Sequence, residues 1–504
     1  SGTAETAEVV AALTAAGADV VQAGPSDPLP ADVAGVVVVT DAADPSAGWS
    51  LTALLQSTAG FGGRVWAVTR GAVAVGRSET VSDVAASAVW GVGRVAALEH
   101  PRLWGGLVDL PAQLGEREGR RFAAVLAGGA EDQVAVRPSG VFARRLRRAT
   151  PAGVVPQVTL SGTVLITGGT GALGSRVARW VVQRGATGVV LLSRRGVAPD
   201  ALVAELTGLG AEVSVVACDV ADREALARVV DGIDDLTGVV HAAGVSATEN
   251  LLDTAPEDYA AVVSGKVSGA LHLDELTAGH DLELFLVFSS IAGVWGSGGQ
   301  AAYAAGNATL DDLVQSRRAA GRAGTAIAWG PWADGGMAGA AGATDYLARR
   351  GLPAMDPELA MQALGLAVDT GDVTTTVADV DWARFAGTFA TQRPAPLFGE
   401  LTVTTETTTP GDRRELSGLP EILALVRAQT AAALGYAGAA QIEADTAFRD
   451  LGIDSVTAVE VRDRINAATG LRLGSSLVFD HPTPQLLAAH LMQALGTAGP
   501  AGTP

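Results

Sequence analysis

Short apolar runs, separated by longer stretches with helical periodicity, fill most of this 504-residue chain. Runs of this length between turn residues predict buried strands, and their alternation with helices predicts α/β layers around largely parallel sheets. Before residue 150 the predicted strands are residues 36–40, 65–69, 106–110 and 134–137. After it they are residues 163–167, 188–192, 213–217, 238–241, 284–289 and 325–329. The pattern predicts two Rossmann-like, doubly wound subdomains.

The same pattern divides the chain into three blocks and two linkers. Residues 1–150 begin with a helical segment and have no glycine-rich turn after any strand, so we expect a truncated, structural subdomain that binds no cofactor and an N-terminus that is trimmed. Residues 151–401 form the second α/β subdomain. Residues 402–418, rich in Thr, Pro and Gly, predict a flexible linker. Residues 419–495 predict a small helical domain, and residues 496–504 a second linker.

Charge and cysteine content exclude several classes of function. The net charge of −19 argues against binding to nucleic acid or to an anionic membrane. The only cysteine, Cys218, excludes an internal disulfide and a cysteine metal cluster; it lies in an apolar run and fits a core residue better than a nucleophile. With no signal peptide and no apolar run of about 18 residues, we expect a cytoplasmic protein.

The predicted strand at residues 163–167 runs into a glycine-rich turn, GGTGALG, which a helical segment follows. Glycines here let the backbone approach a pyrophosphate, and the free N–H groups of a helix N-terminus bind its charge. Because strand, turn and helix occur in the required order, we predict a dinucleotide site; an ordinary tight turn is the alternative. The residues expected to contact the cofactor are Gly168, Gly169, Thr170, Gly171, Leu173 and Gly174.

The end of the next predicted strand indicates which dinucleotide binds. Sites for NAD usually place Asp or Glu there for the ribose 2′-hydroxyl, whereas this chain has Ser193, Arg194 and Arg195. Guanidinium groups suit a 2′-phosphate, so we predict NADPH; a solvated loop is the alternative for the arginines. Further cofactor contacts are expected after the next two strands, at Asp219, Val220, His241, Ala242, Ala243 and Gly244.

Two polar residues and the only lysine form a second candidate group. Ser290 follows a predicted strand, and Tyr303 opens a predicted helix after a glycine-rich segment. A tyrosine can protonate a carbonyl that receives a hydride if its pKa is lowered and a serine helps to hold the carbonyl. Because the other 34 basic residues are arginines, Lys266 is either a chance survivor or does work that a guanidinium cannot. The alternative for Tyr303 is packing at a helix start.

Short-chain dehydrogenases usually carry lysine four residues after the tyrosine, where this chain has Asn307, and Lys266 stands where they place asparagine. The chain resembles the ketoreductase domain of a modular type I polyketide synthase. The resemblance rests on this exchange, the turn GGTGALG, the spacing of Ser290 and Tyr303, and the segments WGPWADGGM and AVWGVGRVAALEHPRLWGGLVDLP. The resemblance implies that Tyr303 donates the proton and Ser290 positions the carbonyl. It also implies that Lys266 tunes Tyr303 and contacts the ribose, and that Asn307 supports the network. Ser289 is expected to be structural.

The resemblance also implies a stereochemical course. Members that form a D-hydroxyl carry Leu-Asp-Asp shortly after the His-Ala-Ala-Gly segment, where this chain reads VSATEN. Members that form an L-hydroxyl carry a tryptophan eight residues before the tyrosine, as Trp295 does here, and a bulky indole would steer the acyl chain from one side. Members that take an epimerised α-carbon have histidine where this chain has Gln300. We expect an A1-type reductase; core packing is the alternative role of Trp295.

The last block resembles an acyl carrier protein at FRDLGIDSVTAVEVRDRI and FDHPTP. Gly452, Ile453, Asp454 and Ser455 match the attachment site of that family, which implies a four-helix domain with 4′-phosphopantetheine on Ser455. Without the resemblance, Ser455 is interpreted as a helix N-cap. Val456 in place of the usual leucine, and GSS in place of a turn with proline, are departures that keep the serine. A flexible linker suits an arm that visits several active sites.

These features favour NADPH-dependent reduction of a carrier-bound β-ketoacyl thioester to an L-3-hydroxyacyl thioester, without α-epimerisation, within a modular polyketide synthase. The expected partners are ketosynthase and acyltransferase domains and a phosphopantetheinyl transferase; no nucleic acid, membrane or metal is expected. One alternative is a redox-silent reductase scaffold with a working carrier, against which the intact catalytic set argues. Another is a free-standing dehydrogenase of soluble substrates, which the carrier block and the linkers disfavour.

Overall fold

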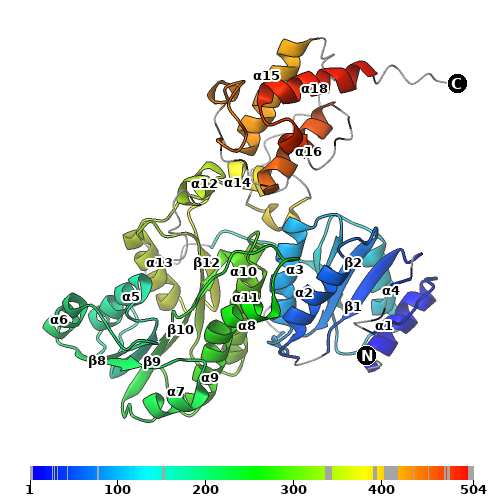
Figure 1. Ribbon diagram of the computed structural model, residues 1–504. Coiled ribbons are helices and arrows are strands. Elements are labelled where there is room, and N and C mark those ends of the chain that lie inside the picture. The colour runs from blue at the N-terminus through cyan, green and yellow to red at the C-terminus, as the bar shows by residue number, and fades with distance from the viewer. Residues whose placement is uncertain are drawn as a thin grey trace. The chain divides into compact units, whose positions relative to one another are not determined.

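The computed structural model describes residues 4–497 except 25, 26, 28, 31, 42, 43, 77, 78, 150–152, 154, 335–342, 390–393, 402–417, 435, 437, 452, 454, 470, 472 and 474–476. The chain divides into two compact units, residues 1–339 with 354–379 and residues 340–353 with 380–504. Both sheets belong to the first unit (Figure 1). The subdomain and linker boundaries given above stay predictions, and almost all of the predicted linker 402–418 lies outside the described residues.

The first sheet has five strands in chain order: β1 (Gly35–Val39), β2 (Arg64–Arg70), β3 (Trp104–Leu110), β4 (Gln133–Arg137) and β5 (Gly140–Ala143). β1 to β4 are parallel, and β5 returns antiparallel. The apolar pattern missed β5 because most of its residues are exposed. Helices α1 (Ala4–Ala15) and α4 (Glu116–Ala127) cover one face, and α2 (Ala47–Ser57) and α3 (Ser87–Glu99) cover the other. The order of the described strands does not reverse, so the first subdomain is Rossmann-like but not doubly wound as predicted, and this sheet lacks the switch point at which doubly wound sheets bind nucleotides.

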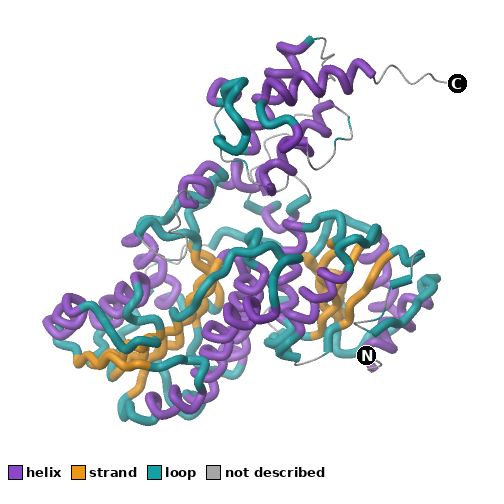
Figure 2. Tube along the Cα trace, in the orientation of Figure 1, coloured by secondary structure: helices purple, strands orange, loops and turns teal. Residues whose placement is uncertain are grey.

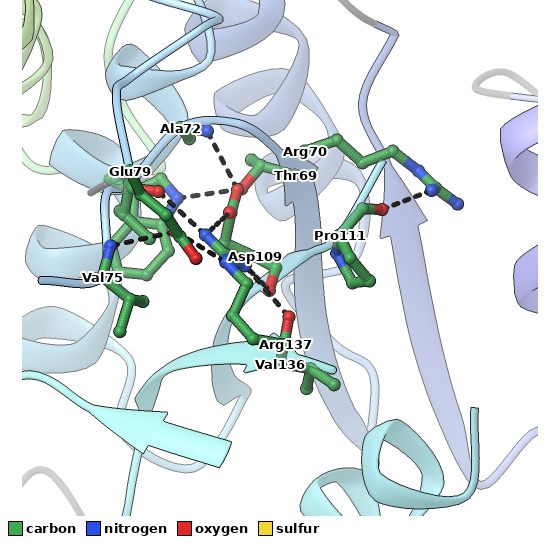
Figure 3. A network of polar contacts seen from close by, with 11 residues as sticks. Thr69, Arg70, Ala72, Val75, Glu79, Asp109, Pro111, Val136 and Arg137 are labelled. Carbon is green, nitrogen blue, oxygen red and sulfur yellow. Dashed lines mark hydrogen bonds and ion pairs between the residues drawn. The ribbon is translucent and has the colours of Figure 1, made fainter. Parts of the chain in front are cut away.

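A buried ion-pair network closes the carboxyl edge of the first sheet (Figure 3). Asp109, whose side chain is 0% exposed, accepts hydrogen bonds from the Thr69 hydroxyl (2.7 Å), the Ala72 N–H (3.0 Å) and the Arg137 guanidinium (2.8 Å). Arg137 also donates to Glu79 at 2.8 Å. Paired side chains therefore fill the edge of the sheet where a nucleotide lies in doubly wound folds.

The second sheet has seven parallel strands in the order β12-β11-β10-β9-β6-β7-β8. Figure 2 shows strands of this sheet in orange, with helices in purple beside them. Their bounds are β6 (Thr163–Thr167), β7 (Gly188–Ser193), β8 (Glu212–Ala217), β9 (Leu236–His241), β10 (Leu284–Ser290), β11 (Thr325–Trp329) and β12 (Thr374–Val377). The pattern missed β12, an edge strand of three threonines and one valine. Strand order reverses between β6 and β9, which creates a switch point at their carboxyl ends. The predicted α/β, Rossmann-like class is confirmed.

Helices cover both faces of the second sheet, as Figure 1 shows. One face packs against α5 (Ala172–Gln183), α6 (Asp200–Gly208) and α13 (Pro357–Asp369). The other packs against α7 (Arg223–Val230), α9 (Gly269–Leu276) and α11 (Ala301–Ala319). α11 also packs on α3 of the first sheet, and a Cβ added at Gly91 would lie 2.5 Å from the backbone of Ala304. The missing side chain at Gly91 therefore lets the two helices approach closely.

The second unit contains a helical domain around an apolar core. Its main helices are α15 (Leu419–Ala433), α16 (Ser455–Thr469), α17 (Leu477–Asp480) and α18 (Pro484–Thr497), and α12 (Ala343–Arg349) and α14 (Trp382–Phe389) belong to the same unit. Ile422, Val426, Val461, Ile465 and Leu487 are among the buried residues of that core. Ser455 is the first residue of α16, while Gly452, Asp454 and the GSS segment at 474–476 lie outside the described residues.

Candidate active site

The glycine-rich turn joins β6 to α5 at the switch point of the second sheet. Gly168 has φ +66°, and its carbonyl accepts a hydrogen bond from the Gly171 N–H at 3.0 Å. A Cβ at Gly174 would lie 2.2 Å from the Gly168 oxygen, so this close turn requires glycine there. Thr170 and Leu173 complete the segment, and the backbone of Gly168 faces that of Ala242 after β9. The local geometry fits the close backbone approach that a pyrophosphate needs.

The predicted 2′-phosphate residues follow β7. Arg194 and Arg195 are exposed, and neither forms an ion pair with any residue that the structure describes. Ser193 is half-buried, and its Oγ accepts from the Gly196 N–H at 3.1 Å. After β8, the exposed Asp219 accepts a hydrogen bond from the Ala221 N–H, and Val220 is buried. Both guanidinium groups are thus accessible to an anion, and their cofactor role stays a prediction.

His241, at the end of β9, is part of a buried chain of hydrogen bonds. The Ala243 N–H donates to Thr167 Oγ1 at 3.2 Å, and Thr167 Oγ1 lies 2.8 Å from His241 Nδ1. His241 Nε2 lies 2.8 Å from the Lys266 carbonyl, which can only accept, so Nε2 carries the proton and Nδ1 accepts from Thr167. Burial and, secondly, the Lys266 charge lower the pKa of His241 to about 4. A neutral imidazole therefore holds the Lys266 backbone, and Gly244 faces the Lys266 side chain.

Lys266 lies in a π-helical turn, η1 (Ser264–Ser268), between α8 (Pro256–Val263) and α9. Such turns interrupt α-helices and occur frequently at functional sites. The side chain is almost fully buried, and its Nζ donates to the Phe288 carbonyl at 3.0 Å. The same nitrogen is 5.3 Å from the centre of the Tyr303 ring. Burial lowers the pKa of Lys266 to about 8, although Asp311 opposes this shift.

Tyr303 is the third residue of α11, and Ser290 ends β10 and caps α10 (Ile291–Trp295). Burial raises the pKa of Tyr303, and hydrogen bonding with Ser290 and Asn307 lowers it. Asn307 Nδ2 donates to the Tyr303 carbonyl at 2.7 Å, and Ser289 Oγ donates to the Asn307 carbonyl at 3.2 Å. The buried Asn307 Oδ1 accepts no hydrogen bond from the described residues, which leaves an acceptor for a water or a ligand. The structure thus brings the four predicted catalytic residues together.

The predicted stereocontrol residues lie between Ser290 and Tyr303. Trp295 ends α10 and is almost fully buried, and Gly296 turns the chain with φ +88°. Gln300 is half-buried, precedes α11 and pairs through its backbone with Glu249. A shallow, open depression lies beside this segment, lined by residues that include Ala247, Glu249, Thr254, Gly299, Gln300 and Ala301.

Sequence reasoning missed a buried carboxyl group near the predicted catalytic residues. Asp311 lies one turn after Asn307 on α11, and burial raises its pKa to about 6, while Ser289 and then Arg94 lower it. Its charge raises the pKa of Lys266. The spacing of four residues on a predicted helix, which places Asp311 on the Asn307 face, was the available signal.

Other chemistries find little support in the described part of the chain. No cluster of three or more His, Cys, Asp or Glu side chains there could hold a metal ion. Burial, and then Asp219, raise the pKa of the Cys218 thiol, which opposes a nucleophilic role. Nor does any described helix combine the length and apolar character needed to cross a membrane.

Three family models match the chain. Residues 162–334 match the KR domain, residues 424–491 the phosphopantetheine attachment site, and residues 2–146 the Rossmann fold domain of the polyketide synthase extender module SpnB. The chain is 49% identical over 469 residues to polyketide synthase GfsA of Streptomyces halstedii, covering 86% of this chain and 6% of that protein. It is 44% identical to the pikromycin polyketide synthase component PikAIII of Streptomyces venezuelae, covering 99% of this chain and 35% of that protein. The chain therefore spans only a small part of these relatives.

Solved ketoreductase structures share the fold. An A1-type ketoreductase is 40% identical, with a TM-score of 0.70, over 79% of this chain and 86% of that one. A C2-type ketoreductase from a modular polyketide synthase is also 40% identical, with a TM-score of 0.74, over 79% of this chain and 94% of that one. Backbone similarity alone therefore does not distinguish the A1 type from the C2 type.

The chain belongs to the ketoreductase and acyl carrier region of modular polyketide synthases. Its reductase part is an oxidoreductase of the short-chain dehydrogenase/reductase type, consistent with a β-ketoacyl reductase. Membership of these families implies NADPH as the reductase cofactor and covalent 4′-phosphopantetheine on the carrier.

Proposed function

We propose that this chain reduces a carrier-bound β-ketoacyl thioester to an L-3-hydroxyacyl thioester with an unepimerised α-carbon. The observation that carries the proposal is the buried cluster of Lys266, Ser290, Tyr303 and Asn307 near the switch point of the second sheet. NADPH, when bound, supplies the hydride for the ketone carbon. The pyrophosphate is assigned to the turn at residues 168–174, and the 2′-phosphate to Arg194 and Arg195.

Tyr303 donates its hydroxyl proton to the ketone oxygen as that oxygen gains negative charge. Ser290, which lowers the pKa of Tyr303, holds the same oxygen and keeps the ketone in line with the tyrosine. The Lys266 ammonium, which lies over the Tyr303 ring, stabilises the tyrosinate that remains, because a nearby cation favours the ionised form of a tyrosine. Asn307 holds the first turn of α11 through the Tyr303 carbonyl.

Oxidation of NADPH with a diketide thioester mimic tests this assignment, in the parent chain and in Tyr303→Phe. We expect the variant to lose on the order of 10²–10⁴ in kcat, the range of general acid catalysis, with NADPH binding unchanged. Equal rates in parent and variant would refute the role of Tyr303. The alternative is a redox-silent scaffold with a functional carrier, and it predicts NADPH binding without oxidation in the parent.

Ser455 is proposed as the attachment point of the phosphopantetheine arm. The match of residues 424–491 to the attachment-site family and the position of Ser455 at the start of α16 support it. A phosphopantetheinyl transferase with coenzyme A should add one arm to the parent, seen as a single mass increment. An arm retained in Ser455→Ala would contradict the assignment.

The L-hydroxyl outcome depends on Trp295. Its position at the end of α10, just before the segment that leads to Tyr303, supports a role in directing the acyl chain. Chiral analysis of the reduced diketide should show the L-hydroxyl from the parent and a mixed product from Trp295→Ala. A D-hydroxyl from the parent would overturn the A1-type assignment.

The partners follow from the multidomain relatives. Because these relatives are polyketide synthases and the chain covers only part of each, we propose that ketosynthase and acyltransferase domains supply the β-ketoacyl thioester. Pull-down of a ketosynthase–acyltransferase fragment from the same synthase should depend on the carrier domain.

A further inference from the structure

We infer that Glu99, at the end of α3, is a positioning residue for the reduction, because its carboxylate ties together the two loops beside the start of α11. The two loops are residues 247–254 and residues 296–300. The inference deepens the proposed function and rests on it, since Tyr303 lies in the first turn of α11. Glu99 belongs to the helix layer of the first sheet, the part of the reductase for which no cofactor role was predicted.

Each carboxylate oxygen of Glu99 accepts a hydrogen bond from a different loop. Oε2 accepts from the Leu251 N–H at 2.7 Å, and Oε1 accepts from the Gly299 N–H at 2.6 Å. The Glu99 side chain is only 9% exposed, so water competes little with either bond. Burial raises the pKa of Glu99, and the two N–H donors oppose this shift because they favour the carboxylate form. Hydrogen bonds to a shielded carboxylate are among the stronger ones in proteins. One side chain of α3 therefore fixes the spacing of both loops.

The two loops are also joined directly to each other. The Glu249 N–H donates to the Gly299 carbonyl at 2.7 Å, which brings Glu249 opposite Gln300. Gly299 has φ +74°, so a residue with a side chain would be strained there. The depression described above is lined by residues of both loops. A shift of either loop therefore changes the shape of the surface beside the start of α11.

Two arginines hold the other end of the same segment. The Arg94 guanidinium, also from α3, donates to the Gly293 carbonyl, and Arg144 donates to the Val294 carbonyl at 2.5 Å. The last carbonyls of a helix have no partner within it, so these donors satisfy the end of α10. Trp295 follows directly. The segment that contains Trp295 is thus held before Trp295 by the Arg94 and Arg144 guanidinium groups and at Gly299 by the Glu99 carboxylate.

The chemistry at this position requires a carboxylate. Glutamine has the same shape as glutamate, but it has one acceptor oxygen, and its NH₂ group would face a backbone N–H. Glu99→Gln therefore breaks one bond to a loop and opposes its donor, without creating a cavity. Because the recorded hydrogen bonds of Glu99 go to backbone N–H groups, its effect reaches the chemistry through loop position.

The experiment compares the parent chain with Glu99→Gln and with the control Glu116→Gln, whose side chain is 83% exposed. Hydrogen exchange is measured for peptides that contain Leu251 and Gly299, and for the β6–α5 segment. We expect exchange at one or both loops to rise roughly tenfold or more in Glu99→Gln, as the loss of a charge-assisted hydrogen bond implies. Exchange in β6–α5 and the Kd for NADPH should stay at parent values, and Glu116→Gln should match the parent throughout.

Activity adds a second readout. With the diketide mimic, Glu99→Gln should change the ratio of the two 3-hydroxyl epimers and raise KM more than it lowers kcat. Unchanged exchange at both loops would overturn the inference. Faster exchange throughout the chain, or failure to fold, would make Glu99 a general stability residue and would also overturn it. A parent that does not oxidise NADPH would refute the proposed function, while the exchange result would still test the tie between the loops.

Discussion

The ammonium nitrogen of Lys266 lies 5.3 Å from the centre of the Tyr303 ring, and the two residues come from different helical segments. The lysine reaches this position because its Nζ is held by the Phe288 carbonyl and its backbone carbonyl is held by His241. Both supports come from neighbouring strands of the second sheet. The position of Lys266 beside Tyr303 therefore depends on the order of the strands in the second sheet. It can be tested by changing the residues that hold Lys266.

Lys266→Arg should keep the charge and lose most of the activity. The Lys266 side chain is almost fully buried and its Nζ donates to the Phe288 carbonyl at 3.0 Å, so a longer planar guanidinium cannot take the same position unchanged. We expect kcat for NADPH oxidation to fall by on the order of 10²-fold. Thermal unfolding checks that the variant is folded. Parent-like kcat in Lys266→Arg would show that charge alone is sufficient.

Gly174→Ala should weaken NADPH binding while the chain stays folded. A Cβ there would meet the Gly168 oxygen at 2.2 Å, so the turn must move, whereas the control Gly208→Ala meets nothing within 4 Å. Displaced N–H groups lose charge-assisted bonds to the pyrophosphate, which corresponds to roughly tenfold to hundredfold weaker binding. Fluorescence titration with NADPH gives the Kd. The prediction fails if the two alanine variants bind NADPH equally well.

The pKa of His241 predicts a loss of stability in acid. Its pKa of about 4 in the folded chain lies below the ordinary 6.5, so between pH 6.5 and 4 the unfolded chain binds a proton that the folded chain excludes. Stability therefore falls as pH drops through this window, by about 3 kcal/mol for this group. Urea unfolding at several pH values should show a smaller fall in His241→Gln. The exposed control His280→Gln should follow the parent, and parallel curves for all three would contradict the assignment.

Arg137→Met should destabilise the first sheet. The variant leaves Asp109 fully buried without its cation, a change that typically costs about 3–5 kcal/mol (Figure 3). The control Arg120→Met breaks an exposed pair with Glu116 and should cost less than about 0.5 kcal/mol. Midpoints of urea unfolding measure both. Equal midpoints for the two variants would show that the buried network does not stabilise the sheet.

Prediction from sequence was most accurate where the signal is local. All ten predicted strands occur, with bounds that differ by at most a few residues, because buried parallel strands are continuous apolar runs. β5 and β12 were missed because each lies at the edge of its sheet and pairs with a neighbouring strand on one side only. Their residues are exposed or polar, so the apolar pattern does not mark them. The glycine turn was recognisable because its requirement, close approach of the backbone, is met within a few residues.

Contacts between helices of the two sheets could not be predicted in the same way. Glu99 and Arg94 are ordinary charged residues in the sequence of α3, and nothing near them in the chain indicates a partner. Their partners become defined only when α3 packs on α11 and brings residues 251, 293 and 299 within reach. The spacing of Asp311 from Asn307 could be read from the sequence, but its burial could not, because burial depends on tertiary packing.

Periodicity and spacing are properties of neighbouring residues, so the sequence alone predicts the strands, the glycine turn and the residue types of the proposed catalytic set. Tertiary structure decided which of these residues meet. It places Lys266 beside Tyr303 and lets His241 hydrogen bond with the Lys266 carbonyl. It also brings the N–H groups of Leu251 and Gly299, in two different loops, within hydrogen-bond distance of Glu99. The physical reason is that burial and hydrogen-bond partners arise from strand order and helix packing, which join segments that lie far apart in the chain.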